Sequence, residues 1–221
     1  MEYGLGRIFM PDERDKNFPL KILLPRKEIT RTYRYYSEGV NLDQGSTPMC
    51  VGFSCFQFLL SSPIKHNLLH IDLTPQQIYH EAQQVDEWTG ESYDGTSVRA
   101  GMKVLQAHGY ISSYFWASTV QETMDFLLSQ GTIVFGINWY NDMFTPTDEG
   151  IIKINNSALA GGHAIVATGV NTKRGLVRLR NSWGRAWGKK GDCYIPGEDL
   201  ERLIKEDGEA ATALEVKKGV M

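Results

Sequence analysis

The chain has 221 residues, a length that fits one large domain, or one domain divided into two lobes, with a sizeable core. The formal net charge is −3 and basic residues form no block, so nucleic-acid binding is not expected. No apolar run approaches the ~18–20 residues that span a bilayer, which gives no reason to expect a membrane protein. The first residues also lack the basic start and apolar core of a secretory signal.

Three cysteines, at positions 50, 55 and 193, are too few for a disulfide framework, and their odd number leaves at least one thiol free. Free thiols fit a reducing compartment, so we expect a cytoplasmic protein. The chain has no Cys-x-x-Cys pair. We therefore expect neither a metal site nor a cofactor.

Residues 1–40 are irregular, rich in charge and tyrosine, and hold three of the eight prolines. This composition predicts an N-terminal extension that wraps the body of the protein and is not a separate domain. The remaining residues, 41–221, are expected to form one domain.

Helical patterns begin at Cys50. The stretch CVGFSCFQFLLSS is apolar all round, which predicts a central buried helix. The next helix begins with Thr74 as N-cap, Pro75 in the first position and Gln77 completing a capping box. Two further helices are expected over 97–109, ending at Gly109, and 119–131, where Thr119 and Glu122 form a capping box and Gly131 ends the helix.

After residue 131 the spacing of apolar residues changes from that of helices to that of strands. Strands are predicted over 132–138, 163–170, 176–181 and 193–196, and residues 171–175 are predicted to form a hairpin turn. Helices first and strands second indicate an α+β protein. We expect a helical lobe over about 41–130 and an antiparallel β lobe over about 131–221. A cleft between such lobes is a natural place for a site.

Cys50 stands at the start of a helix, directly after the turn-forming run DQGSTPM. A helix N-terminus favours an anion, and the thiolate is the nucleophilic form of cysteine, so the position predicts a depressed pKa for Cys50. Gln44, six residues earlier, could donate its amide to an oxyanion together with the Cys50 backbone N–H. Alternatively, Cys50 could be a buried, inert cysteine, and Gln44 could be an ordinary polar residue of a loop.

His163 opens an apolar strand after two glycines, which leave space for the imidazole to reach a cleft and act as a base and then an acid. Asn181 ends another strand, and its side-chain oxygen could orient that imidazole. Trp183 could shield this hydrogen bond from water. Each of the three could instead have a purely structural role, His163 as a core histidine, Asn181 as a turn residue and Trp183 as a core aromatic residue.

Taken together, QGSTPMCVGFS, GGHAIVATGV and LRNSWGRAWGKKGD resemble the papain-like cysteine peptidases over about residues 40–205. The order Cys, His, Asn, the six-residue spacing from Gln44 to Cys50 and the NSWG stretch carry the resemblance. DGTSVRAGMKVLQAHG makes it most similar to bacterial and phage-type members, which implies the cytoplasm of a bacterial cell or of a phage-infected host as the location. The resemblance implies a papain-like two-lobe α+β fold with the active site in the cleft.

For function, the resemblance implies a cysteine endopeptidase that forms an acyl-enzyme on Cys50. His163 would be the acid and base, Asn181 would orient it, and Gln44 would complete the oxyanion hole. It further implies that Gly95 pairs with the backbone of an extended polypeptide substrate, and that Gly162 and Trp183 also lie in the substrate-binding site.

Some positions depart from the family pattern. Met49 precedes the nucleophile where serine is usual, Val51 replaces a tryptophan, and Gly162 stands where Asp or Asn is frequent. None of these changes removes a catalytic group. Gly136 and Gly161 fall near the main specificity pocket of the family, which indicates an open pocket and leaves the substrate preference unsettled.

Two alternatives remain open from the sequence. One is a non-proteolytic Cys–His enzyme, such as a cell-wall amidase, transpeptidase or deamidase, and the other is a catalytically idle binding module on the same fold. Residues 1–40 likewise have three possible roles: an inhibitory prosegment, a partner-docking segment or a structural arm that covers part of the cleft. The last is favoured, because the long helical stretch typical of prosegments is missing.

Overall fold

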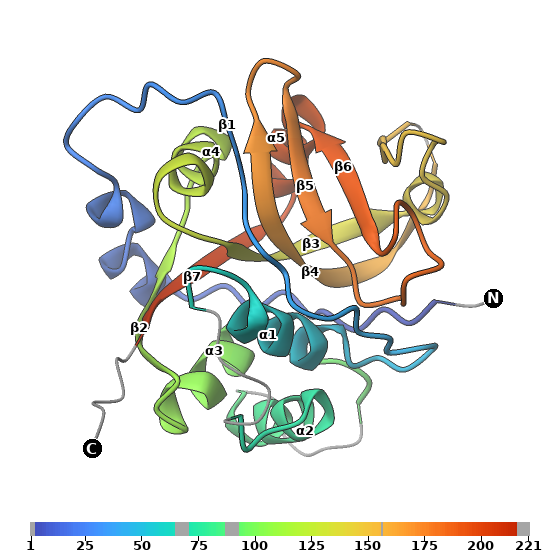
Figure 1. Ribbon diagram of the computed structural model, residues 1–221. Helices are drawn as coiled ribbons and strands as arrows, with labels where there is room; N and C mark the ends of the chain where they lie inside the picture. The colour runs from blue at the N-terminus through green and yellow to red at the C-terminus, as the bar shows by residue number, and fades with distance from the viewer. Residues whose placement is uncertain (1–2, 65–70, 87–92, 156, 216–221) are drawn as a thin grey trace.

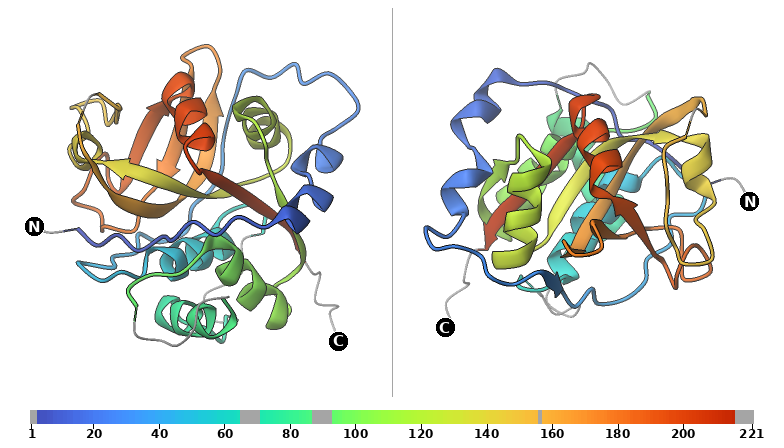
Figure 2. Two further views of the ribbon diagram at one scale, coloured as in Figure 1. Left: turned by 180° about the vertical axis from the view of Figure 1, so that it is seen from behind. Right: turned by 90° about the horizontal axis from the view of Figure 1, so that it is seen from above.

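The computed structural model describes residues 3–64, 71–86, 93–155 and 157–215. A helical layer and an antiparallel sheet face each other, and the N-terminal segment runs between them (Figures 1 and 2). The α+β organisation expected from the sequence is confirmed. Within the described ranges, no helix is both long and apolar enough to cross a bilayer.

Four of the helices, α1 to α4, begin and end close to the predicted positions, whereas α5 was not predicted from the sequence. Thr74 and Gln77 form the expected reciprocal capping box, with Pro75 in the first helical position. Thr119 caps the helix that follows it, although the Glu122 carboxylate accepts from the Ser118 N–H and not from the cap itself. The helices are α1 (Cys50–Leu60), α2 (Pro75–Val85), α3 (Val98–Ala107), α4 (Val120–Ser129) and α5 (Gly197–Lys205).

One sheet joins the strands in the order β2-β7-β3-β4-β5-β6, and β1 adds to β4. The four predicted strands are present, and the chain also forms three that the sequence did not predict, β1, β2 and β7. The strands are β1 (Tyr33–Tyr35), β2 (Ile111–Trp116), β3 (Ile133–Tyr140), β4 (Leu159–Asn171), β5 (Leu176–Arg180), β6 (Asp192–Pro196) and β7 (Glu209–Glu215).

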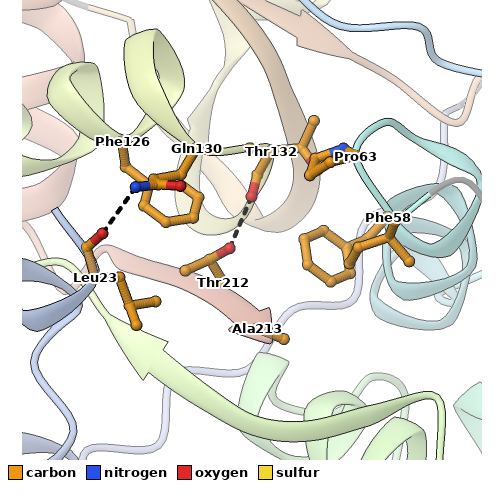
Figure 3. Close-up of a pocket in the computed structure, with 10 residues that line it drawn as sticks. Leu23, Phe58, Pro63, Phe126, Gln130, Thr132, Thr212 and Ala213 are labelled. Carbon is orange, nitrogen blue, oxygen red and sulfur yellow. Dashed lines mark hydrogen bonds between the residues drawn. The ribbon is translucent and has the colours of Figure 1, made fainter. Parts of the chain in front are cut away.

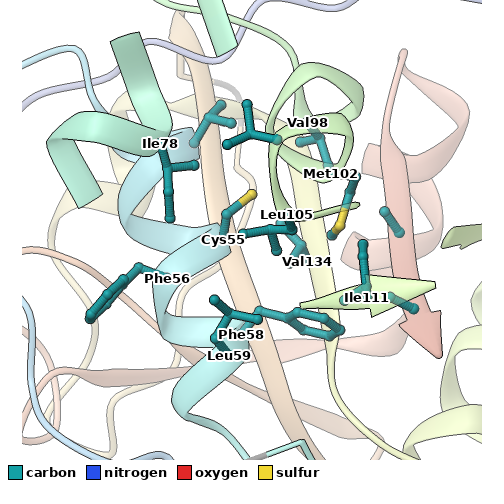
Figure 4. Close-up of a cluster of buried hydrophobic side chains, with 14 of the residues drawn as sticks. Cys55, Phe56, Phe58, Leu59, Ile78, Val98, Met102, Leu105, Ile111 and Val134 are labelled. Atoms are coloured by element: carbon teal, nitrogen blue, oxygen red, sulfur yellow. The ribbon is translucent and has the colours of Figure 1, made fainter. Parts of the chain in front are cut away.

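Helix α1 is buried at all eleven positions. Cys55 and Phe58 of this helix face Met102 and Leu105 of α3 and Val134 of β3 in one apolar cluster (Figure 4). A second cluster lies on the other side of the sheet and includes residues of α4 and α5. The sequence places α4 in the helical lobe, whereas its apolar side chains pack with the strands. The lobe boundary near residue 130 stays a prediction.

The N-terminal extension contains two short 3₁₀ helices, η1 (Glu13–Asn17) and η2 (Leu20–Leu23), followed by β1. In η1, Asp15 pairs with the buried Arg99 of α3. Beyond β1, the Glu38 carboxylate is buried between Arg178 and Arg180 of β5. The extension is therefore attached to both layers of the fold.

Candidate active site

Cys50 is the first residue of α1, and its side chain is fully buried. The Ala164 N–H of β4 donates to its Sγ at 3.3 Å. Since Ala164 follows His163 directly, the thiol lies against the part of β4 that carries the histidine. The helix N-terminus and the sheet thus bring together two residues that are more than a hundred positions apart in the sequence.

His163 and Asn181 meet across the pairing of β4 with β5. The His163 Nε2 and the Asn181 Oδ1 are 2.8 Å apart, and both side chains are buried. His163 Nδ1 is also buried and has no hydrogen-bond partner in the described part of the chain. The ring is therefore oriented through one nitrogen, while the other is left for a proton transfer.

Trp183 covers this pair. Its ring stacks on the His163 imidazole with 4.6 Å between centroids and an interplanar angle of 28°. Trp139 of β3 packs edge-on against the same imidazole at 4.9 Å. The two indoles thus pack on the His163 ring beside its hydrogen bond to Asn181, and the role of Trp183 in substrate binding stays a prediction.

Gln44 lies in the loop before α1 and is nearly buried. Its Oε1 accepts from the Ser182 hydroxyl at 2.6 Å, while its Nε2 donates to the carbonyls of Thr47 and Gly4 at 2.7 and 3.2 Å. The Trp183 Nε1–H donates to the same Gly4 oxygen at 3.1 Å. The amide of Gln44 thus already binds the carbonyl oxygen of a chain that lies in the cleft.

That chain is the N-terminal segment 3–9, which we call the cleft segment. It passes between the helical layer and the sheet (Figure 2, left, dark blue). The N–H groups of Gly6 and Arg7 both donate to the Gly162 carbonyl at 3.0 Å. Gly162 is therefore a backbone contact of the protein's own N-terminal segment, and its role in substrate binding stays a prediction.

The cleft segment has no space for a side chain at Gly4 or Gly6. A Cβ at Gly4 would lie 2.0 Å from the Thr47 carbonyl oxygen, and one at Gly6 would lie 2.0 Å from the Pro48 carbonyl oxygen. The segment can press this closely onto the loop before Cys50 only because both residues are glycines.

The backbone pairing expected at Gly95 occurs one residue later. Thr96 donates its N–H to the Gly6 carbonyl and accepts from the Ile8 N–H, both at 2.9 Å. The N–H of Gly95 is bound to the Tyr79 hydroxyl and its carbonyl to the Gln83 amide, so neither is free for a ligand. Gly95 instead leaves room for the cleft segment, since a Cβ there would lie 2.4 Å from the Gly6 carbonyl oxygen.

Burial beneath the cleft segment shifts the pKa values of both Cys50 and His163. Burial raises the pKa of the Cys50 thiol to about 12, although the Ala164 N–H opposes this shift. Burial lowers the pKa of the His163 imidazole to about 4, against the hydrogen bond to Asn181. The depressed cysteine pKa expected from the sequence is therefore wrong for this state. A dry cleft favours the neutral thiol and the neutral imidazole.

Ser182 and Thr96 were missed by the sequence analysis. Ser182 binds Gln44 through its hydroxyl, and its own N–H donates to the Asn181 Oδ1 at 2.8 Å. It thereby connects Gln44 to Asn181, the hydrogen-bond partner of His163. Its place inside NSWG was the available signal, whereas nothing in the sequence distinguished Thr96 from its neighbour Gly95.

Two hollows lie outside this arrangement. One, of about 410 Å³, continues from the cleft beside Tyr3 and Trp183. The other, of about 180 Å³, lies away from Cys50 between α1, α4 and β7, and is lined by Phe58, Phe126 and Thr212 among others (Figure 3). No group of three His, Cys, Asp or Glu side chains that could hold a metal ion occurs within the described ranges.

Comparison with known proteins agrees with this geometry. The family model described as papain family cysteine protease matches residues 71–206, which include His163 and Asn181. An uncharacterized peptidase C1-like protein of Acanthamoeba polyphaga mimivirus is 21% identical over 198 residues. That match covers 70% of this chain and 63% of the viral protein. Cys50 and Gln44 precede the region matched by the family model.

Solved structures of the same family share the fold. Xylellain, a cysteine protease from Xylella fastidiosa, is 17% identical with a TM-score of 0.68, and the match covers 98% of each chain. The digestive procathepsin L2 of Tenebrio molitor larval midgut is 16% identical with a TM-score of 0.67. It covers 96% of this chain and 78% of the beetle protein. The expected papain-like fold is confirmed, and the chain belongs to the papain family of cysteine proteases.

Proposed function

We propose that the protein is a cysteine endopeptidase, with Cys50 as nucleophile and His163 as acid and base. The observation that supports this most directly is the relation of His163 to its neighbours. Asn181 holds one ring nitrogen, Trp183 covers the ring, and the Cys50 sulfur lies against the next residue of the same strand. The other nitrogen is left to exchange a proton with the thiol.

In the proposed reaction, the Cys50 proton moves to His163 Nδ1 and the thiolate attacks the carbonyl carbon of the peptide bond. The Gln44 Nε2 and the Cys50 backbone N–H stabilise the developing oxyanion. The imidazolium then protonates the leaving amine as the C–N bond breaks, which leaves a thioester on Cys50. Water, deprotonated by His163, hydrolyses the thioester and restores the thiol.

We propose an extended polypeptide as the substrate. The backbone of the cleft segment is held by hydrogen bonds that a chain of any sequence could form. Its partners are Gly162, Thr96, Gln44 and Trp183. The cleft segment therefore stands in for such a substrate. With the segment in place the cleft is occupied, and the protein is latent.

We further propose that residues 1–40 are a permanent arm whose first part covers the cleft. The contacts of Asp15 and Glu38 attach the rest of the arm to both layers of the fold, which favours displacement of the first part over removal of the whole. The test is the mass of the active protein. Full-length protein during turnover supports the arm, and loss of residues 1–40 upon activation refutes it.

The finer classification is also a proposal. We place the chain among the bacterial and phage-type members, on the DGTSVRAGMKVLQAHG stretch. All three cysteines are free, which supports a reducing compartment such as the cytoplasm.

The activity is tested by peptide hydrolysis with full-length protein and with Gly6→Ala, which is designed to loosen the cleft segment. Cys50→Ala should abolish turnover, and Gln44→Ala should lower kcat by about 10²–10³-fold. Cys55→Ala, which removes the other thiol of α1, is the matched control and should retain activity. If Gly6→Ala exposes a reactive Cys50 but cleaves no peptide, the protein is a different kind of amide-processing enzyme.

A further inference from the structure

Helix α2 presents three polar side chains to the segment that precedes α3. Tyr79, Gln83 and the C-cap residue Asp86 lie four and three positions apart, a spacing that favours one face of the helix. Tyr79 and Gln83 are almost completely buried. The partners of all three side chains lie within residues 93–96, the segment that ends at the residue which pairs with the cleft segment.

Both backbone groups of Gly95 are bound by this helix. The Tyr79 hydroxyl accepts from the Gly95 N–H at 2.9 Å, and the Gln83 Nε2 donates to the Gly95 carbonyl at 3.2 Å. The same Nε2 donates to the Tyr93 carbonyl at 2.8 Å. Because α2 uses both groups of Gly95, the next residue, Thr96, provides the N–H and the carbonyl that pair with a chain in the cleft.

Asp86 holds Thr96 through its side chain. The Asp86 Oδ2 accepts from the Thr96 hydroxyl at 2.9 Å, and the Oδ1 accepts from the Tyr93 hydroxyl at 2.6 Å. Thr96 itself is fully buried. One carboxylate thus ties both ends of segment 93–96 to the end of α2. A threonine whose side chain is fixed in this way presents its backbone to the cleft at a defined position.

We infer that these three side chains of α2 are positioning residues, which hold Thr96 ready to pair with the backbone of an extended substrate. Their hydrogen bonds decide that Thr96, and not Gly95, is the pairing residue. Binding at Thr96 therefore costs little further ordering of the protein. This inference rests on the proposed peptidase function for its effect on substrates, but the same pairing with the cleft segment can be measured without turnover.

The first test uses the full-length protein and no substrate. Thr96→Val removes the hydroxyl that Asp86 binds and keeps the branched shape and the backbone groups. The N–H groups of the cleft segment should then exchange with deuterium about five- to tenfold faster, as expected when one hydrogen bond that supports the pairing is lost. Thr96→Ser, which keeps the hydroxyl, should exchange at a rate close to that of the unaltered protein. Mass spectrometry of the N-terminal peptide measures the rates.

Thr212→Val is the matched control for this test. The buried Thr212 hydroxyl donates to the Thr132 carbonyl at 2.9 Å within the sheet, away from Cys50. The control therefore loses a buried hydrogen bond of the same kind, but exchange of the cleft segment should stay unchanged. Equal exchange in Thr96→Val and the unaltered protein, or the same acceleration in Thr212→Val, would overturn the inference.

The second test measures turnover in Gly6→Ala, with peptides that are lengthened one residue at a time on each side of the cleaved bond. One of these steps should lower KM about tenfold, because the added residue reaches Thr96. Adding Thr96→Val, or Tyr79→Phe, which removes the acceptor of the Gly95 N–H, should abolish most of that gain without changing kcat for the shortest cleaved peptide. Thr96→Ser should keep the gain. An equal loss of kcat for peptides of every length would indicate a merely structural role and would overturn the inference.

The outcomes separate the two proposals. Faster exchange in Thr96→Val without cleavage of any peptide would support the positioning role and refute the peptidase function. Cleavage with a length dependence that survives both Thr96→Val and Tyr79→Phe would support the peptidase function and overturn the role of α2.

Discussion

The Ser182 hydroxyl donates a hydrogen bond to the Gln44 Oε1 at 2.6 Å, across 138 residues of sequence. Because this bond fixes which end of the amide faces the cleft, it directs the Gln44 NH₂ group toward the place where an oxyanion would form. The Ser182 N–H binds the Asn181 Oδ1, so one residue positions two groups of the candidate site.

Ser182→Ala should therefore lower kcat by about tenfold or more, but by less than Gln44→Ala, because the amide donor remains and loses only its orientation. KM should change little. Steady-state kinetics on Gly6→Ala with and without the change measure the effect, with the exposed Ser118→Ala as control. An unaltered kcat in Ser182→Ala would show that Gln44 needs no such support.

The raised pKa of Cys50 predicts how the full-length protein reacts with alkylating reagents. A thiol with a pKa near 12 has almost no thiolate at neutral pH, so the labelling rate should rise about tenfold per pH unit from 7 to 10 without a plateau. Gly6→Ala should accelerate labelling near neutral pH by at least about tenfold, because water re-enters the cleft. The label is located by mass spectrometry of the Cys50 peptide.

The control for this experiment is Gly175→Ala in the hairpin between β4 and β5, where a Cβ meets no atom within 4 Å and where the φ of +64° confines the strain of the change to a turn outside the cleft segment. It should label at the rate of the unaltered protein. Rapid labelling of the unaltered protein at pH 5 would contradict the covered state, since it requires a thiolate already paired with imidazolium.

Glu209 makes the cleft segment sensitive to pH. Its carboxyl has a pKa raised to about 7 by burial, while the Arg7 guanidinium opposes that shift. A protonated Glu209 no longer compensates the buried Arg7 guanidinium, so protonation weakens the attachment of the segment. Asp15 and Arg99 also act on Glu209, in opposite directions.

Limited proteolysis of the cleft segment should accordingly be several-fold faster at pH 5.5 than at pH 8, after correction for the protease's own pH dependence. In Arg7→Met/Glu209→Gln, which replaces the ion pair by two neutral side chains, the two rates should agree. A pH effect of the same size in this double variant would assign it to another group.

Glu38 should be essential for stability. Its carboxylate is buried between Arg178 and Arg180 and also accepts from the Thr168 hydroxyl. Glu38→Gln leaves Arg178 without a carboxylate partner in the described part of the chain and Arg180 with Asp192 alone, which should cost about 3–5 kcal/mol. For a chain of this size, that lowers the melting temperature by roughly 6–20 °C.

Calorimetry of Glu38→Gln, with the exposed Glu28→Gln as control, measures this contribution. A large loss supports the view that residues near 38 are permanent structure. A shift no larger than that of Glu28→Gln would instead favour an extension that the fold can lose.

Local patterns in the sequence determined helices α1 to α4 and four of the strands, because a cap such as Thr74 or an apolar run such as that of α1 acts within a few residues of its own position. They did not determine β7, whose EAATALE stretch is rich in alanine, a residue of low strand propensity. That segment is a strand because β2 and β3 bind it from both sides.

The same division holds for the candidate site. Cys50, Gln44, His163 and Asn181 were identified from the sequence, since each stands in a motif that its own neighbours define. Only the tertiary structure decided that Thr96 pairs in place of Gly95, that Arg7 pairs with Glu209, and that the thiol is protonated in the covered state. These properties depend on contacts and burial between distant segments, which no local pattern encodes.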